Sequence, residues 1–272
     1  RFDPDQALRE DVTAKIDLGT EISAQVEAQV FLLRPGSLNP DGPWTPHRDN
    51  HLPEQTGRLV ETLKPIARKA EQEGVILALE THAVSIMDPP EKCREIVELV
   101  GSKHLRLILD AVNHFQSLQQ VYQSSDWVKC IFDEIGSIAP IAHIKDLKIS
   151  KGLVLQIDQE VPGEGELDLA LVLKRFHAFH PDGYGLIEHL GPDKIPQAAT
   201  NVRRIAKENG CIIHYCAVSV CIWFFGCSPF IFSSLLAHDR KQSRKLIALQ
   251  IGSLRNTYER TPILGILKHF FF

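Results

Sequence analysis

The first 210 residues of this sequence contain little cysteine. Two of the six cysteines, Cys93 and Cys130, lie there, and the other four lie within residues 211–272. Two cysteines so far apart give no disulfide framework, and the spacing of the other four matches no common zinc motif. Residues 1–5 also lack the apolar run of a secretion signal. We therefore expect a protein of a reducing compartment, located in the cytoplasm.

Positive charge is scarce over the same part of the chain. Residues 1–210 carry 23 basic and 32 acidic side chains, whereas residues 211–272 carry seven basic and two acidic ones. An acidic surface repels the phosphate backbone of nucleic acids. We therefore expect no nucleic-acid partner.

Charge is absent altogether from residues 211–237, a segment of 27 residues that precedes the basic residues 240–245. Such a segment is long enough to span a bilayer. Gly226, Pro229 and several polar residues dilute it, however, so we favour translated intron or frame-shifted sequence over a membrane anchor. We divide the chain into residues 1–210 and an atypical tail, 211–272, whose native origin the composition puts in question.

Strand-like and helix-like segments alternate through residue 210. Apolar runs indicate strands at 26–33, 75–80, 105–110, 138–144 and 184–188. Amphipathic periodicity indicates intervening helices, most clearly at 53–73. This alternation predicts an α/β fold with a parallel sheet.

Four polar residues stand at or near the ends of predicted strands: Glu80, Asp110, His143 and Glu188. One acid in such a place is commonly a helix cap or an ion-pair partner. The carboxyl ends of parallel strands lie on one face, however, so all four residues should converge there. Three carboxylates and an imidazole repel one another unless a cation is present. The set suits one divalent ion, with Mn²⁺, Mg²⁺ or Co²⁺ favoured and Zn²⁺ as a further candidate.

The motifs around these residues resemble the sugar phosphate isomerase/epimerase family, the xylose isomerase-like TIM barrels. The motifs are LALETH at 77–82, LILD at 107–110, AHIKD at 142–146, PGEGELD at 162–168 and LIEH at 186–189. The resemblance covers about residues 1–210. It implies a TIM (β/α)₈-type barrel. Only five strands are expected where a barrel has eight, so they should correspond to about strands four to eight of a barrel truncated at its N-terminus.

The resemblance implies that the chain is an enzyme. It makes Glu80, Asp110, His143 and Glu188 the metal ligands, with Glu80 and Glu188 also the two catalytic acids that move a proton between adjacent carbons. The expected activity is isomerisation or epimerisation of a keto sugar or sugar phosphate through an enediolate. A dehydratase of the inosose or dehydroshikimate type is the alternative, and a catalytically inactive truncated barrel is another.

Several residues near these motifs are candidates for substrate binding: His82, Asn113, Lys145 and Asp146. His82 and Asn113 could equally cap loops, and Lys145 and Asp146 could form an exposed ion pair. The long segment after residue 33 contains Arg34, Trp44 and His47. These residues could line the pocket, but a solvated loop is the simpler interpretation.

The sequence departs from the DNA-repair branch of this superfamily. Asn113 stands where that branch has a histidine, and no Asp-x-His motif follows His143. Together with the acidic composition, this favours a small carbohydrate substrate. A homo-oligomer is compatible with these expectations.

Overall fold

The computed structural model describes residues 2–28 and 30–213, together with the backbone of three further strands at 219–225, 228–233 and 246–251. In the 211–237 tail segment, residues 214–218, 226–227 and 234–237 lie outside the described residues, so the suggested membrane anchor is not tested there. Among the described helices, none combines the length and the apolar character that crossing a membrane requires.

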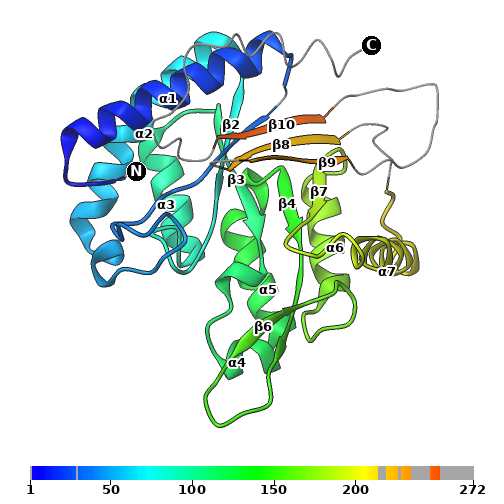
Figure 1. The fold of residues 1–272 in the computed structure, drawn as a ribbon. Coiled ribbons are helices and arrows are strands. Elements are labelled where there is room, and N and C mark those ends of the chain that lie inside the picture. Colours follow the sequence, from blue (N-terminus) through cyan, green and yellow to red (C-terminus); the bar gives the residue numbers. More distant parts are fainter. Residues whose placement is uncertain (1, 29, 214–218, 226–227, 234–245, 252–272) are drawn as a thin grey trace.

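A largely parallel sheet forms the centre of the molecule (Figure 1). Its strands, in spatial order, are β7 (Tyr184–Ile187), β4 (Ile141–Ile144), β3 (Leu105–Asp110), β2 (Ile76–Glu80), β1 (Val30–Leu33), β10 (Leu246–Ile251), β8 (Ser219–Phe225) and β9 (Ser228–Ser233). Among the described strands of this sheet, β8 and β9 pair antiparallel and the other neighbours pair in parallel. The five strands β1, β2, β3, β4 and β7 form half of a TIM barrel, which confirms the predicted incomplete barrel.

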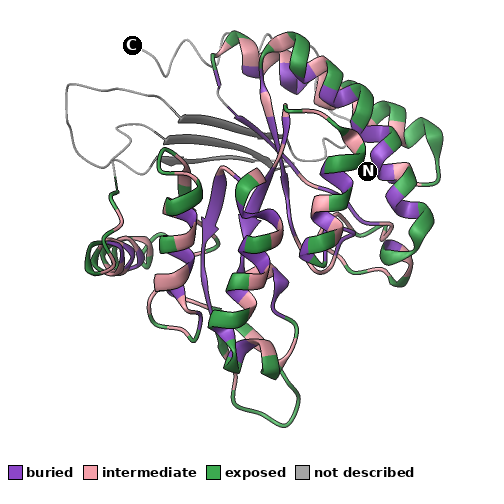
Figure 2. Cartoon of the chain, turned by 180° about the vertical axis from the view of Figure 1, so that it is seen from behind, coloured by how far each residue is buried: buried purple, intermediate pink, exposed green. Residues whose placement is uncertain are grey.

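Helices cover the strands and turn their buried faces toward them (Figure 2). They are α1 (Gln6–Gln25), α2 (Pro53–Glu73), α3 (Pro90–Val100), α4 (Leu118–Tyr122), α5 (Ser124–Ile135), α6 (Leu169–Phe179) and α7 (Ile195–Glu208), with 3₁₀ turns η1 (Arg48–His51), η2 (Val112–His114) and η3 (Gly136–Ile138). Capping residues mark several of the helix ends. The Asp5 carboxylate accepts the Ala7 N–H at the start of α1, and Gly74, whose φ of 70° suits glycine, follows the end of α2.

Alternate strand residues contribute to two different cores. One set, including Phe31, Leu77 and Leu107, packs with the helices. The other set forms a smaller apolar layer on the inner face of the half-barrel: Val30, Leu32, Ala78, Ile108 and Ile141. Because side chains alternate along a strand, the next inward positions are 34, 80, 110 and 143.

Two strands begin later than the sequence suggests. Helix α1 continues to Gln25 and a turn follows it, so β1 starts at Val30 rather than at residue 26. The η3 turn and Pro140 precede β4, which starts at Ile141 rather than at 138. An antiparallel hairpin of β5 (Asp146–Ile149) and β6 (Ile157–Glu160) interrupts the expected strand–helix alternation.

The core between the strands and the helices allows a direct test of stability. Leu107 is 0% exposed within that core, so Leu107→Ala should lower the free energy of unfolding by about 2–5 kcal/mol in a denaturant titration. Leu99→Ala, on α3 with the side chain 49% exposed, is the matched control and should cost less than about 1 kcal/mol. Equal losses in the two variants would contradict this packing.

Candidate active site

The four predicted metal ligands continue the inner face of the half-barrel. Each lies two residues beyond an inward-facing apolar residue. The pairs are Ala78 and Glu80, Ile108 and Asp110, Ile141 and His143, and Leu186 and Glu188. The sheet register also places Asp110 directly beside His143. The polar residues therefore follow the apolar layer at the carboxyl end of the strands.

The four side chains meet as one cluster, called here the four-residue cluster: Glu80, Asp110, His143 and Glu188. One ligand atom from each lies within 4.8 Å of the others. His143 Nδ1 is at their centre, 3.0 Å from Glu188 Oε2, 3.3 Å from Asp110 Oδ2 and 3.4 Å from Glu80 Oε1. Asp110 is fully buried, and Glu80 and His143 are nearly so.

Lys145 supplies a positive charge to the same cluster. Its Nζ lies 2.5 Å from Asp110 Oδ2 and 3.1 Å from Glu188 Oε2. Burial alone would lower the pKa of Lys145, but the charges of Asp110 and Glu188 raise it above its usual value. Burial likewise opposes ionisation of Glu188, yet His143 and Lys145 hold its pKa well below the usual range. Glu188 is therefore ionised at neutral pH.

The donor set of the four-residue cluster fits a divalent cation. Its ligands are carboxylate oxygens and one imidazole nitrogen, which suit Mg²⁺, Mn²⁺ or Zn²⁺. In addition, the buried Glu188 Oε2 lies 3.0 Å from His143 Nδ1 and 3.1 Å from Lys145 Nζ. A cation bound there would compete with these two groups for the same oxygen.

Three of the predicted substrate-binding residues also hold the loops around the cluster. The Asn113 amide donates to the Thr81 carbonyl at 3.1 Å, and His82 Nδ1 accepts the Val84 N–H at 3.1 Å. The Asp146 carboxylate accepts four backbone N–H groups, from residues 147, 163, 165 and 167. These contacts give Asp146 and Asn113 a loop-positioning role. That His82, Asn113, Lys145 and Asp146 contact a substrate stays a prediction.

Arg34 reaches this region although the sequence pattern favoured a solvated loop there. Its guanidinium carbon lies 5.4 Å from the centroid of the Trp44 ring, and the Trp44 and His82 rings are 5.0 Å apart. Burial lowers the pKa of Arg34, whereas the nearby charges of Glu80 and Glu188 raise it. The signal that could have found Arg34 is its position, two residues after Leu32 on the inner face.

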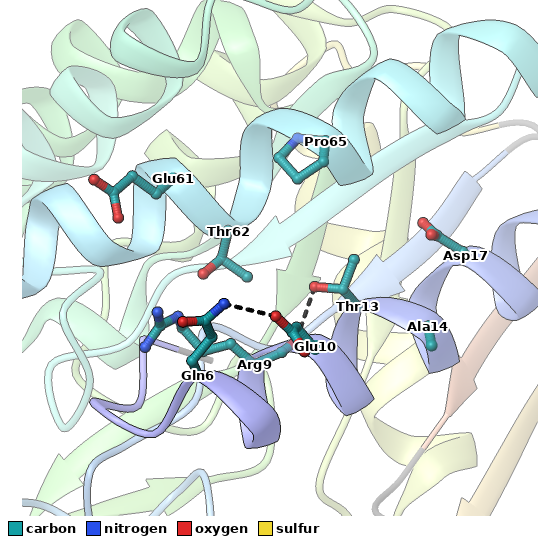
Figure 3. A pocket seen from close by; sticks show the side chains of 9 residues that line it. All are labelled: Gln6, Arg9, Glu10, Thr13, Ala14, Asp17, Glu61, Thr62 and Pro65. Atoms are coloured by element: carbon teal, nitrogen blue, oxygen red, sulfur yellow. Dashed lines mark hydrogen bonds between the residues drawn. The ribbon is translucent and has the colours of Figure 1, made fainter.

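A separate surface pocket of about 540 Å³ lies between α1 and α2 (Figure 3). Gln6, Arg9 and Glu10 line it from α1, and Thr62 and Pro65 from α2. The Gln6 amide donates to the Glu10 carboxylate across one turn of α1. None of the predicted site residues lines this pocket, so it is distinct from the four-residue cluster.

Comparison with known proteins identifies the family. Residues 2–209 match the family model described as "Xylose isomerase-like TIM barrel". The chain belongs to this family. A search of curated protein sequences found no match.

Several solved structures share the fold at low sequence identity. A xylose isomerase domain protein from Planctomyces limnophilus is 15% identical, with a TM-score of 0.55 over 73% of this chain and 65% of its own. A D-tagatose 3-epimerase-like protein is 19% identical, with a TM-score of 0.59, and the match covers 76% of this chain and 73% of that protein. A xylose isomerase-like TIM barrel protein from Mycobacterium smegmatis in complex with magnesium is 13% identical, with a TM-score of 0.59 over 77% and 70%.

These likenesses establish the fold but do not select one chemistry. The matched structures also include a probable 3-DHS dehydratase and an endonuclease IV. The chain spans 65% of the length of the Planctomyces limnophilus protein, so the activity of a whole relative is not transferred to it directly. The choice among chemistries depends on the residues of this chain.

The cluster predicts one divalent cation per chain. Elemental analysis and Mn²⁺ titration should give a stoichiometry of one for the wild type. Asp110→Asn should weaken binding by more than about 100-fold, because even the outer partners of metal ligands are worth 10–100-fold. Glu98→Gln, on the exposed face of α3, should bind like the wild type. Unchanged affinity in a folded Asp110→Asn protein would contradict the site.

Cation affinity should rise with pH. Burial alone would lower the pKa of His143, but Glu188, Asp110 and Glu80 raise it well above its ordinary value in the metal-free protein. Below that raised pKa the imidazole is protonated, and a cation can bind Nδ1 only by displacing a proton. Calorimetric Mn²⁺ titrations in buffers of different ionisation enthalpy should therefore detect proton release. Affinity that falls as the pH rises would exclude this linkage.

Proposed function

We propose that the chain is a divalent-metal-dependent isomerase or epimerase of a keto sugar or sugar phosphate, acting in the cytoplasm. The observation that carries the proposal is that Glu80 and Glu188 belong to one cluster with Asp110 and His143. Proton transfer between adjacent carbons needs two groups that can remove and return a proton next to a carbonyl. Two ionisable carboxylates beside a cation site supply that combination.

Glu80 and Glu188 approach the cluster from different strands. Glu80 ends β2 and Glu188 follows β7, with β3 and β4 between them in the sheet. A substrate carbon held between the two carboxylates could lose its proton to one and regain a proton from the other. Delivery from the second side inverts the carbon, which is epimerisation, and delivery to the neighbouring carbon is isomerisation.

The charges around Glu188 keep it in the ionised form that a base requires. In the metal-free protein His143 and Lys145 hold its pKa low, so the carboxylate carries no proton at neutral pH. A bound divalent cation would supply a Lewis acid that stabilises negative charge on the substrate oxygens. Asp110 and His143 would hold that cation, with Lys145 orienting the Asp110 carboxylate.

Exchange of substrate protons with solvent tests the proposal. Ketoses incubated with the metal-loaded protein in deuterated water should incorporate deuterium at the carbon next to the carbonyl. Glu80→Gln and Glu188→Gln should each lower the rate by about 10²–10⁴-fold, because each removes one proton-transfer group. The measurement is NMR of the recovered sugar.

The matched control for these variants is Glu54→Gln on the exposed start of α2, which should exchange protons at the wild-type rate. A product that has lost water would assign the site to a dehydratase instead. Absence of exchange for every ketose, in protein that binds the cation, would refute proton-transfer catalysis.

A further inference from the structure

Arg34 directly follows β1, at the place that corresponds to Glu80 at the end of β2. The two strands pair in parallel, with Leu32 beside Ala78 and Leu33 beside Leu79. The next residues along are Arg34 and Glu80. Since Leu32 and Ala78 both face the inner apolar layer, Arg34 and Glu80 leave their strands on the same inner face. A guanidinium therefore flanks the four-residue cluster at the side of β1.

The loops around Arg34 are held in place. Arg34, Trp44 and His82 form what we call the Arg34 group, in which the guanidinium lies over the Trp44 ring and that ring contacts His82. The fully buried Asn50 side chain accepts the Leu38 N–H and donates to the Val84 carbonyl, both at 2.9 Å. These bonds join the loop that carries Trp44 to the loop that carries His82. The Arg34 group is therefore pre-organised.

The charge balance of the site favours an anionic ligand. Among the Asp, Glu, Lys and Arg side chains of the cluster and its flanks, three are negative and two positive: Glu80, Asp110 and Glu188 against Arg34 and Lys145. A divalent cation held by the cluster would leave one net positive charge. A neutral sugar leaves that charge unbalanced, a singly charged anion neutralises it, and a doubly charged anion leaves one net negative charge.

We propose that Arg34, oriented by Trp44, binds a carboxylate or phosphate group of the substrate, so that the site selects anionic keto sugars over neutral ones. This inference rests on the proposed function, which gives the position of the reacting carbons. It concerns which ligand charge the site selects. A guanidinium presents a planar fork of N–H donors that matches the oxygens of either anion. The stack on Trp44 limits its orientations, so less freedom is lost when the anion binds.

Ligand binding tests this without turnover. Calorimetry with the Mg²⁺-loaded full chain would compare D-fructose, D-fructose 6-phosphate and 5-keto-D-gluconate. The wild type should bind one or both anions more tightly than fructose. Comparing its affinities for the phosphate and the carboxylate ligand shows which of the two groups is recognised. Arg34→Gln should weaken the preferred anion by about 10- to 100-fold and leave fructose unchanged. Trp44→Leu should weaken the same anion to a smaller extent.

Two variants serve as controls. Arg48→Gln removes the same charge from an exposed position on the same loop and should bind all three ligands like the wild type. Arg34→Lys keeps the charge without the planar fork, so it should retain part of the preference, and it replaces Arg34→Gln if that variant does not fold.

Three results would overturn the proposal: equal wild-type affinity for fructose and both anions, equal weakening of all three ligands by Arg34→Gln, or an equal effect of Arg48→Gln. A wild type that selects anions through Arg34 but exchanges no substrate proton would refute the proposed function and leave this inference standing.

Discussion

Three carboxylates buried at one point create the electrostatic problem on which the rest of this site depends. Glu80, Asp110 and Glu188 lie around a single imidazole nitrogen and are largely withdrawn from water. Ionised carboxylates in that position repel one another and are costly to bury without positive partners. Lys145 and His143 supply part of the compensation within the chain. A divalent cation would supply the rest, and its ligands are the same oxygens.

The fold places these residues through the alternation of strand side chains. Positions 78, 108, 141 and 186 point into the inner apolar layer, so positions 80, 110, 143 and 188 point to the same side just beyond it. The apolar layer below and the loops held by Asn50, Asn113 and Asp146 around the rim limit how far the cluster can relax. Local strand geometry thus brings the four side chains together, and the loops surround them.

Sequence patterns predicted the cluster because each of its members follows an apolar run, a signal visible within six or seven residues. They did not place Arg34 near the cluster, because the long segment after it has the composition of a solvated loop. The pairing of β1 with β2, which sets Leu33 beside Leu79, brings the next residue, Arg34, toward Glu80. The β5–β6 hairpin was missed for a similar reason. Its strands have four residues each and are partly polar, so their pairing depends on contacts that a local pattern does not contain.

The central claim of this account is that the four-residue cluster holds a divalent cation. Anomalous diffraction from crystals of the full chain grown with Mn²⁺ tests it most directly. The account predicts one strong peak among the carboxylates of Glu80, Asp110 and Glu188, within coordination distance of His143 Nδ1. A well-ordered cluster without a peak at saturating Mn²⁺, or a peak bound only elsewhere on the chain, would contradict it.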